Sequence, residues 1–343
     1  MRGWPVVFAL AAAACSAPHT SPSSSSGGPD AVNVPAPRPM APASLSFSTS
    51  RVPTFRWELA HGSSGARVEI CRDRACDAVV TSFDATGSSG VASTELPAGL
   101  VFWRLRGLSA GAAGSTTSVT WELVVPARSA PVATTWGTML DANGDGVGDV
   151  VAGDSNSFQP SQHVYVFLGS AHGPPSAPSS VLSGGSPLLH YAASIASAGD
   201  VDGDGYGDLA VGSPTEDTVY FYRGGPSGYS EPPSLVLTGP AQSRFGAAVS
   251  SAGDVNGDGY ADLVVGAPIQ PMGGGSSVVG GARVYLGGPS GLSPTAFVEL
   301  APPATSDEQG FGQYVSDAGD MDGDGRGDVA VYGGTGSFDP QRI

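Results

Sequence analysis

Basic residues, cysteines and long apolar runs are scarce in this sequence. Its 343 residues include 15 Lys and Arg against 31 Asp and Glu, which gives a formal net charge of −16. Stripes of positive charge, which nucleic-acid phosphates require, are lacking, so we expect no nucleic-acid partner. Only 13% of residues are charged, whereas glycine (51) and proline (29) are abundant. This composition favours short strands and tight turns, and therefore predicts an all-β protein.

The one marked apolar run stands at the N-terminus, in "MRGWPVVFALAAAAC". It is too short to cross a bilayer, and it follows Arg2 and ends in small residues, as an export signal does. The "AAAC" ending resembles a bacterial lipobox, although Ala12 stands where leucine is usual. The resemblance implies a signal peptide at residues 1–15 and lipidation of Cys15. We expect an exported lipoprotein of the bacterial cell envelope or outer surface, which meets the membrane through this anchor only; a secreted protein is the alternative.

Two further segments precede the repeats. Residues 16–44, rich in Ser, Pro, Gly and Ala, are expected to form a linker with little to bury. Residues 45–127 contain short β-branched or alternating runs between turn residues, which predict a small β-sandwich with Trp57, Trp103 and Trp121 in its core. With "WRLRG" in a later strand, this segment resembles a fibronectin type III module. In an exported protein, the nearby Cys71 and Cys76 are expected to form a disulfide.

An acidic, glycine-rich loop occurs four times from residue 131 onward. We number its nine positions from the first aspartate, so that loop 1 is Asp141–Asp149, loop 2 Asp200–Asp208, loop 3 Asp254–Asp262 and loop 4 Asp320–Asp328. The first aspartates are 59, 54 and 66 residues apart. A period of this length indicates a repeated structural unit. Each unit has the form strand, acidic loop, strand, turn, strand, glycine-rich turn, strand.

The loops present oxygen atoms at alternating positions, which predicts a calcium site in each. Calcium takes six to eight oxygen ligands, and side chains at positions 1, 3, 5 and 9 of a tightly curled loop converge on one point. Position 7 varies and is expected to supply its backbone carbonyl, and glycine at position 6 permits the turn. None of the four loops contains Cys or His, which disfavours zinc or copper as the bound metal. The expected ligands are Asp141, Asn143, Asp145, Val147 and Asp149; Asp200, Asp202, Asp204, Tyr206 and Asp208; Asp254, Asn256, Asp258, Tyr260 and Asp262; and Asp320, Asp322, Asp324, Arg326 and Asp328.

An EF-hand begins in the same way but requires glutamate at position 12 and a helix on each side. Position 12 here is Ala152, Val211, Val265 or Val331, and strand-like runs follow the loops. The third unit instead contains Phe245-Gly246 and Gly266-Ala267-Pro268, and the region resembles the FG-GAP repeat of the integrin alpha-subunit β-propeller. The resemblance implies that residues 131–343 form about three and a half propeller blades, fewer than a closed ring has. We expect a chain truncated relative to a full propeller, or one completed by a partner.

These observations predict an all-β fold, namely a small β-sandwich followed by a partial β-propeller of calcium-loop blades. The function implied by the resemblance is a surface-anchored, calcium-binding scaffold, with about one ion in each of the four loops, that adheres to an unknown protein or glycan. A carbohydrate-binding propeller is the alternative, with Tyr206 and Tyr260 as stacking groups. The sequence contains no recognisable nucleophile elbow, zinc-protease or phosphate-loop motif, so we expect no enzyme and no catalytic residue; a propeller-based hydrolase is a lesser alternative.

Overall fold

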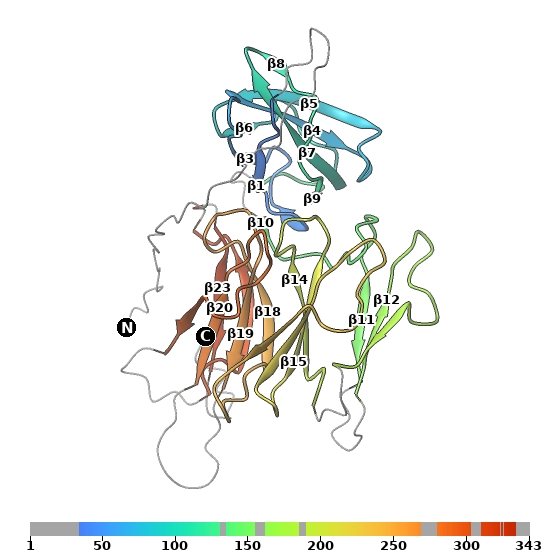
Figure 1. Ribbon diagram of the computed structural model, residues 1–343. Coiled ribbons are helices and arrows are strands. Elements are labelled where there is room, and N and C mark those ends of the chain that lie inside the picture. The colour runs from blue at the N-terminus through green and yellow to red at the C-terminus, as the bar shows by residue number, and fades with distance from the viewer. Residues whose placement is uncertain are drawn as a thin grey trace, which may run out of the picture.

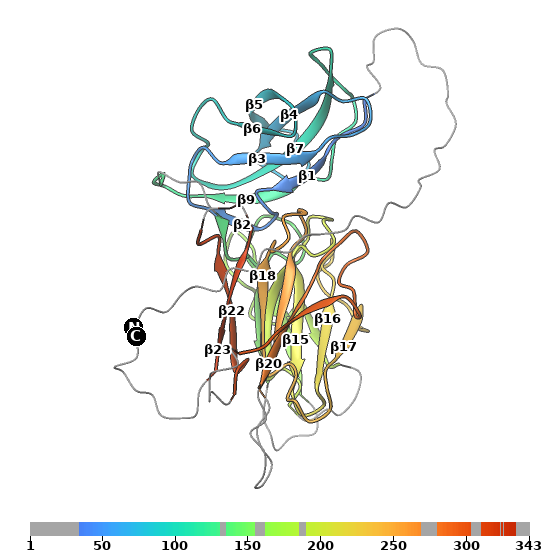
Figure 2. The ribbon, with the colours of Figure 1, turned by 90° about the vertical axis from the view of Figure 1, so that its left-hand side faces the viewer.

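The computed structural model describes residues 34–130, 135–154, 162–184, 190–268, 280–302 and 310–333, apart from Gly323 and Gly325. Within these ranges every regular element is a β-strand, which confirms the all-β prediction. The strands form a sandwich and a row of propeller blades, and Figures 1 and 2 show the sandwich seated at one end of the blades. Cys15, the signal sequence and most of the predicted linker lie outside the described residues. No described helix is long and apolar enough to span a membrane.

Two sheets make up the sandwich. The smaller has the order β1-β3-β6, with β1 Arg38–Ala41, β3 Thr54–Glu58 and β6 Ser89–Val91. The larger has the order β10-β2-β9-β7-β4-β5, with β8 beside β7. Its strands are β10 Thr135–Trp136, β2 Ser46–Ser48, β9 Trp121–Val125, β7 Gly99–Ser109, β4 Gly65–Cys71, β5 Val79–Thr86 and β8 Ala112–Ala113.

Aromatic side chains fill the space between these two sheets. Trp57, Trp103 and Trp121 are at most 2% exposed. Phe55 and Trp121 both pack edge-on against Trp103, with ring centroids 4.9 and 5.5 Å away. Edge-to-face packing of this kind adds to the stabilisation that comes from burying the rings. Cys71 and Cys76 form a disulfide at the end of β4, with Cα atoms 5.1 Å apart.

The folded sandwich extends beyond the boundaries predicted for it. Strand β1 lies inside the expected linker, where Val34 is also buried, and it occupies a sheet edge, the position in a sheet that tolerates proline. Strand β10 lies inside the expected propeller region but pairs with β2, Thr135 opposite Ser48. That pairing satisfies backbone groups that β2 would otherwise leave open at its edge. Both predicted boundaries were therefore wrong by one short strand.

Four antiparallel sheets follow, one for each repeat. Blade 1 contains β11 Val150–Gly153, β12 Val164–Phe167 and β13 Ser180–Leu182. Blade 2 contains β14 Ser194–Gly199, β15 Asp208–Ser213, β16 Thr218–Tyr222 and β17 Leu235–Thr238. Blade 3 contains β18 Ala248–Gly253, β19 Asp262–Ala267, β20 Gly281–Tyr285 and β21 Phe297–Leu300. Blade 4 is described over β22 Tyr314–Gly319 and β23 Asp328–Tyr332.

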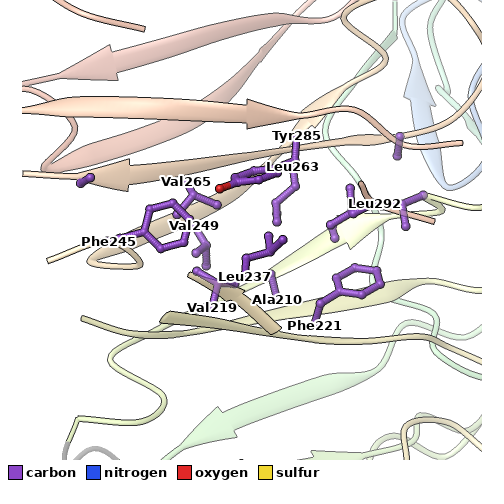
Figure 3. Packing of buried hydrophobic residues seen from close by; sticks show 14 residues of the cluster. Ala210, Val219, Phe221, Leu237, Phe245, Val249, Leu263, Val265, Tyr285 and Leu292 are labelled. Atoms are coloured by element: carbon purple, nitrogen blue, oxygen red, sulfur yellow. The ribbon is translucent and has the colours of Figure 1, made fainter. Parts of the chain in front are cut away.

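Neighbouring blades share their hydrophobic cores, which explains why the strand after each loop is a continuous apolar run. All six residues of β15 are buried. Leu209 and Val211 face the core shared with blade 1, whereas Ala210 faces the core shared with blade 3. In Figure 3, Val219, Phe221 and Leu237 of blade 2 pack against residues of blade 3: Val249, Leu263, Val265, Tyr285 and Leu292. A single blade has two apolar faces, so it needs a neighbour on each side.

Candidate metal centre in the acidic loops

The four acidic loops occupy equivalent places in the blades. Loops 2, 3 and 4 connect the first strand of a blade to the second, and position 9 is the first residue of that second strand. The residue before position 1 pairs with position 9 across the sheet, as Gly199 does with Asp208 and Gly253 with Asp262. Loops 2 to 4 therefore start and end on one ladder rung, which curls their nine positions into a closed turn.

Carboxylates at positions 1 and 9 hold the loop backbone in this curl. The position 1 carboxylate accepts the N–H of the glycine at position 6, at 2.7 Å in loop 1 and 2.8 Å in loops 2 and 3. One oxygen of position 9 accepts the N–H of position 2, at 2.7–2.9 Å in all four loops. In loops 1 to 3 the other oxygen of position 9 accepts the N–H of Gly169, Gly224 or Gly287, respectively. These glycines follow the equivalent strands β12, β16 and β20.

Positions 3, 5 and 7 form a second, shorter series of hydrogen bonds. Position 3 accepts the N–H of position 5, whether the acceptor is Asp202 or the amide oxygen of Asn256. Position 5 in turn accepts the N–H of position 7, as Asp204 does from Tyr206. Asn143 and Asp145 of loop 1, Asp258 of loop 3, and Asp322 and Asp324 of loop 4 make the same bonds. Ligation by the carbonyls of Val147, Tyr206, Tyr260 and Arg326 stays a prediction.

Aspartates at positions 1, 3 and 9 come together in two loops. Asp200, Asp202 and Asp208 each place a carboxylate oxygen within 4.8 Å of the others, and so do Asp320, Asp322 and Asp328. The position 5 aspartates are not members of these two clusters. Loops 1 and 3 have asparagine at position 3, so their carboxylates alone do not make the same triad.

Burial places these carboxyl groups in an environment that suits a cation. Asp200 and Asp208 are at most 3% exposed, and Oδ1 of Asp200 is buried without a hydrogen-bond partner among the described residues. Burial, and after it the charges of neighbouring aspartates, raises the pKa of Asp200 and Asp208 well above the ordinary value. Burial also raises the pKa of Asp254 to about 6. A buried oxygen with no donor and several carboxylates around it fits a hard divalent ion such as calcium.

In loop 2 one carboxylate forms an ion pair with an arginine of the same blade. Arg223 Nη1 lies 3.0 Å from Asp202 Oδ2, and its Nη2 donates to the carbonyl of Ser290 in blade 3. Leu168 and Leu286 occupy the equivalent positions of blades 1 and 3, directly before Gly169 and Gly287. Blades 1 and 3 thus have Asn at loop position 3 and Leu before the glycine, whereas blade 2 has Asp and Arg at the same two places. An alignment of "YFYRGG" with "VYLGG" shows arginine in place of leucine, a signal for the ion pair that the sequence-based prediction missed.

Residues 200–265, from position 1 of loop 2 into β19, match the model of the FG-GAP-like repeat. This segment, which contains loops 2 and 3, is thus similar to the FG-GAP-like repeat. Integrin alpha-5 of Xenopus laevis is 34% identical over 145 residues, which cover 37% of this chain and 14% of that protein. Integrin alpha-IIb of Mus musculus is 35% identical over 162 residues, which cover 43% of this chain and 15% of that protein.

Integrin alpha-4 of Xenopus laevis is 31% identical over 159 residues, or 43% of this chain and 15% of that protein. The chain therefore spans about one seventh of the length of these integrin subunits. Among solved structures, the exotype rhamnogalacturonan lyase YesX aligns with 86% of this chain and 57% of that chain. Its TM-score of 0.37 and identity of 13% are too low to support an argument about fold or activity.

Replacement of Arg223 by leucine, the residue at the equivalent positions, is expected to tighten calcium binding to loop 2 by roughly 3- to 10-fold at low salt, because a competing cation is removed. Asp202→Asn alone should weaken binding, since Arg223 is then uncompensated, and the double variant should approach the original affinity. Calorimetric titration of the full chain measures the three changes. Arg244→Leu, which removes an exposed arginine from the turn before β18, is the control. Equal affinities for the Arg223 variant and the unmodified chain would exclude the counter-charge.

Calcium binding is expected to release protons near pH 6. Because burial raises the pKa of Asp254 to about 6, the metal-free folded chain holds protons that the unfolded chain has lost. The metal-free blades should therefore lose stability as the pH rises from about 4, the ordinary aspartate pKa, through 6. Calcium binds the ionised form, so its affinity should weaken as the pH falls through the same interval. Titrations in two buffers of different ionisation enthalpy measure the protons released; equal heats in both at pH 6 would contradict the prediction.

Proposed function

We propose that this chain is an exported, calcium-binding protein of the adhesion type, whose blades form a scaffold that binds another macromolecule. The carrying observation is the repetition of one loop geometry in successive blades, in a chain similar to integrin alpha subunits. In this proposal each loop holds one calcium ion, which the oxygens of positions 1, 3, 5 and 9 and the carbonyl of position 7 coordinate. Four divalent ions would halve the formal net charge of −16.

Bound calcium would supply a positive charge among carboxylates that otherwise repel one another. The chain's own part is to hold those carboxylates in place: the N–H groups of positions 2 and 6 fix positions 9 and 1. Ions that bind only the curled loop stabilise the folded blade by mass action. The proposed role is therefore that of a binding scaffold and not of an enzyme.

A glycan is the alternative ligand class, and the loop tyrosines bear on it. Tyr206 and Tyr260 were the aromatic groups expected to stack on sugars. The guanidinium of Arg74 lies over the Tyr206 ring at 4.5 Å, and that of Arg38 over the Tyr260 ring at 4.9 Å. Each ring thus already has a stacking partner from the sandwich. This favours a protein ligand, bound at a surface away from the loops.

The ligand class can be tested with the purified chain on arrays of extracellular proteins and of glycans, in excess calcium and in chelator. We expect calcium-dependent binding to a protein, because ordered blades present a fixed surface. The double variant Asp254→Asn/Asp262→Asn, which removes two carboxylates from loop 3, is the matched control in the calcium buffer. Binding to glycans alone would favour the lectin alternative, and release of free sugar from a glycan would indicate a hydrolase.

The proposal also includes anchoring to the bacterial envelope through lipid on Cys15, as the lipobox resemblance implies. Export agrees with the disulfide between Cys71 and Cys76, since such bonds persist in oxidising compartments. Mass spectrometry of the protein from membranes is expected to show a mature N-terminus at Cys15 with attached acyl chains. An intact Met1, or cleavage without acylation, would exclude the anchor.

A further inference from the structure

The sandwich rests directly on the calcium loops of the first three blades. The glycines at position 6 show how close the approach is. A Cβ atom on Gly205 would lie 2.5 Å from Nη1 of Arg74, and one on Gly259 would lie 2.6 Å from Cα of Met40. A Cβ atom on Gly146 would lie 2.9 Å from side-chain atoms of Leu100 and Phe102. The glycine that permits the turn thus also leaves room for the sandwich.

Arg74 of the sandwich joins two loops at once. Its Nε donates to the carbonyl of Gly144, position 4 of loop 1, at 2.7 Å. Its Nη2 donates to the carbonyl of Gly205, position 6 of loop 2, and to Glu122 Oε1 at 2.9 Å. The Glu122 side chain is fully buried and belongs to β9 of the sandwich. The guanidinium therefore links the sandwich core to the backbones of blades 1 and 2.

Arg38 makes the corresponding contacts with loop 3. Its Nη1 donates to the carbonyl of Asp258 at position 5, and its Nε lies 3.0 Å from Glu58 Oε2 on the neighbouring strand. A third sandwich residue, Trp121, donates from its Nε1 to the carbonyl of Gly203 in loop 2 at 3.4 Å. The four acceptors that belong to the loops are all backbone carbonyls of positions 4 to 6, in the segment between the position 3 and position 9 side chains.

The disulfide hairpin fixes the backbone that carries Arg74. Cys71 and Cys76 are buried against Phe102, and the N–H of Cys76 donates to the carbonyl of Asp73 at 3.0 Å. A small closed loop has few conformations, so the arginine is held close to its bonding position before the two parts meet.

We propose that the calcium loops of blades 1 to 3 are the seat of the sandwich, and that calcium binding fixes its orientation through Arg74 and Arg38. The inference rests on the proposed calcium binding. Guanidinium groups are attracted to the acidic loops with or without the ion, but the carbonyls of positions 4 to 6 point at them only when the loop is curled. Calcium offsets the repulsion that opens the loop, and therefore favours docking. By reciprocity, docking must raise the calcium affinity by the same factor.

The test uses the full chain and follows hydrogen exchange of residues 71–76 and the radius of gyration from X-ray scattering. Chelation is expected to speed exchange in this hairpin and to increase the radius, with the near-ultraviolet circular dichroism of the sandwich tryptophans retained. Arg74→Ala/Arg38→Ala should release the sandwich in excess calcium too. It should leave the number of bound ions unchanged and weaken their affinity by about 5-fold or more, the lower end of typical coupling. Arg72→Ala, an exposed arginine of the same hairpin, is the matched control.

The outcomes separate the inference from the function on which it rests. Calcium binding without a change in hydrogen exchange or in the radius of gyration would overturn the proposed calcium-dependent docking of the sandwich. Full calcium affinity in the double arginine variant would do the same. Neither result would count against the calcium sites themselves. A flat calorimetric titration of the unmodified chain would overturn both. Loss of the tryptophan signal in the double variant would mean that the arginines serve the fold of the sandwich and not its docking.

Discussion

Repulsion among buried carboxylates is the constraint on which this structure depends. Each acidic loop gathers three or four aspartates in nine residues, and the fold withdraws several of them from water. Backbone N–H groups offset part of the cost, at 2.7–2.9 Å from positions 1 and 9. They leave Oδ1 of Asp200 without a partner in the described chain. A cation that binds all of these oxygens would turn the least favourable part of each blade into the part that holds its strands together.

The same loops determine how the larger parts of the molecule meet. The blades depend on their neighbours, because both faces of β15 are buried in shared cores. The position of the sandwich depends on the loop carbonyls that accept hydrogen bonds from Arg74 and Arg38. A substitution in a single loop is therefore expected to affect both the packing of the neighbouring blades and the contact between the blades and the sandwich. The loops thus connect the sandwich to the blades in addition to their proposed binding of calcium.

Much of this organisation follows from the sequence, since four copies of one motif show which positions are constrained. The order of strand, loop and apolar strand could be predicted because the aspartates and the runs after them repeat together. The pairings of β1 and β10 could not, because an edge strand of a few residues is chosen by its partner and not by its own pattern. Arg74 also could not be assigned, because its acceptors lie 70 and 131 residues away in the chain. Arg223 could have been found, since it replaces a leucine of the other blades.

Equilibrium dialysis of the purified, metal-depleted chain against radioactive calcium shows whether the acidic loops bind calcium. We expect saturable binding of one ion per loop, and the loss of one ion when Asp200 and Asp208 are both replaced by asparagine. Binding that stays near zero at excess calcium, or that is unchanged by this double replacement, would contradict this expectation.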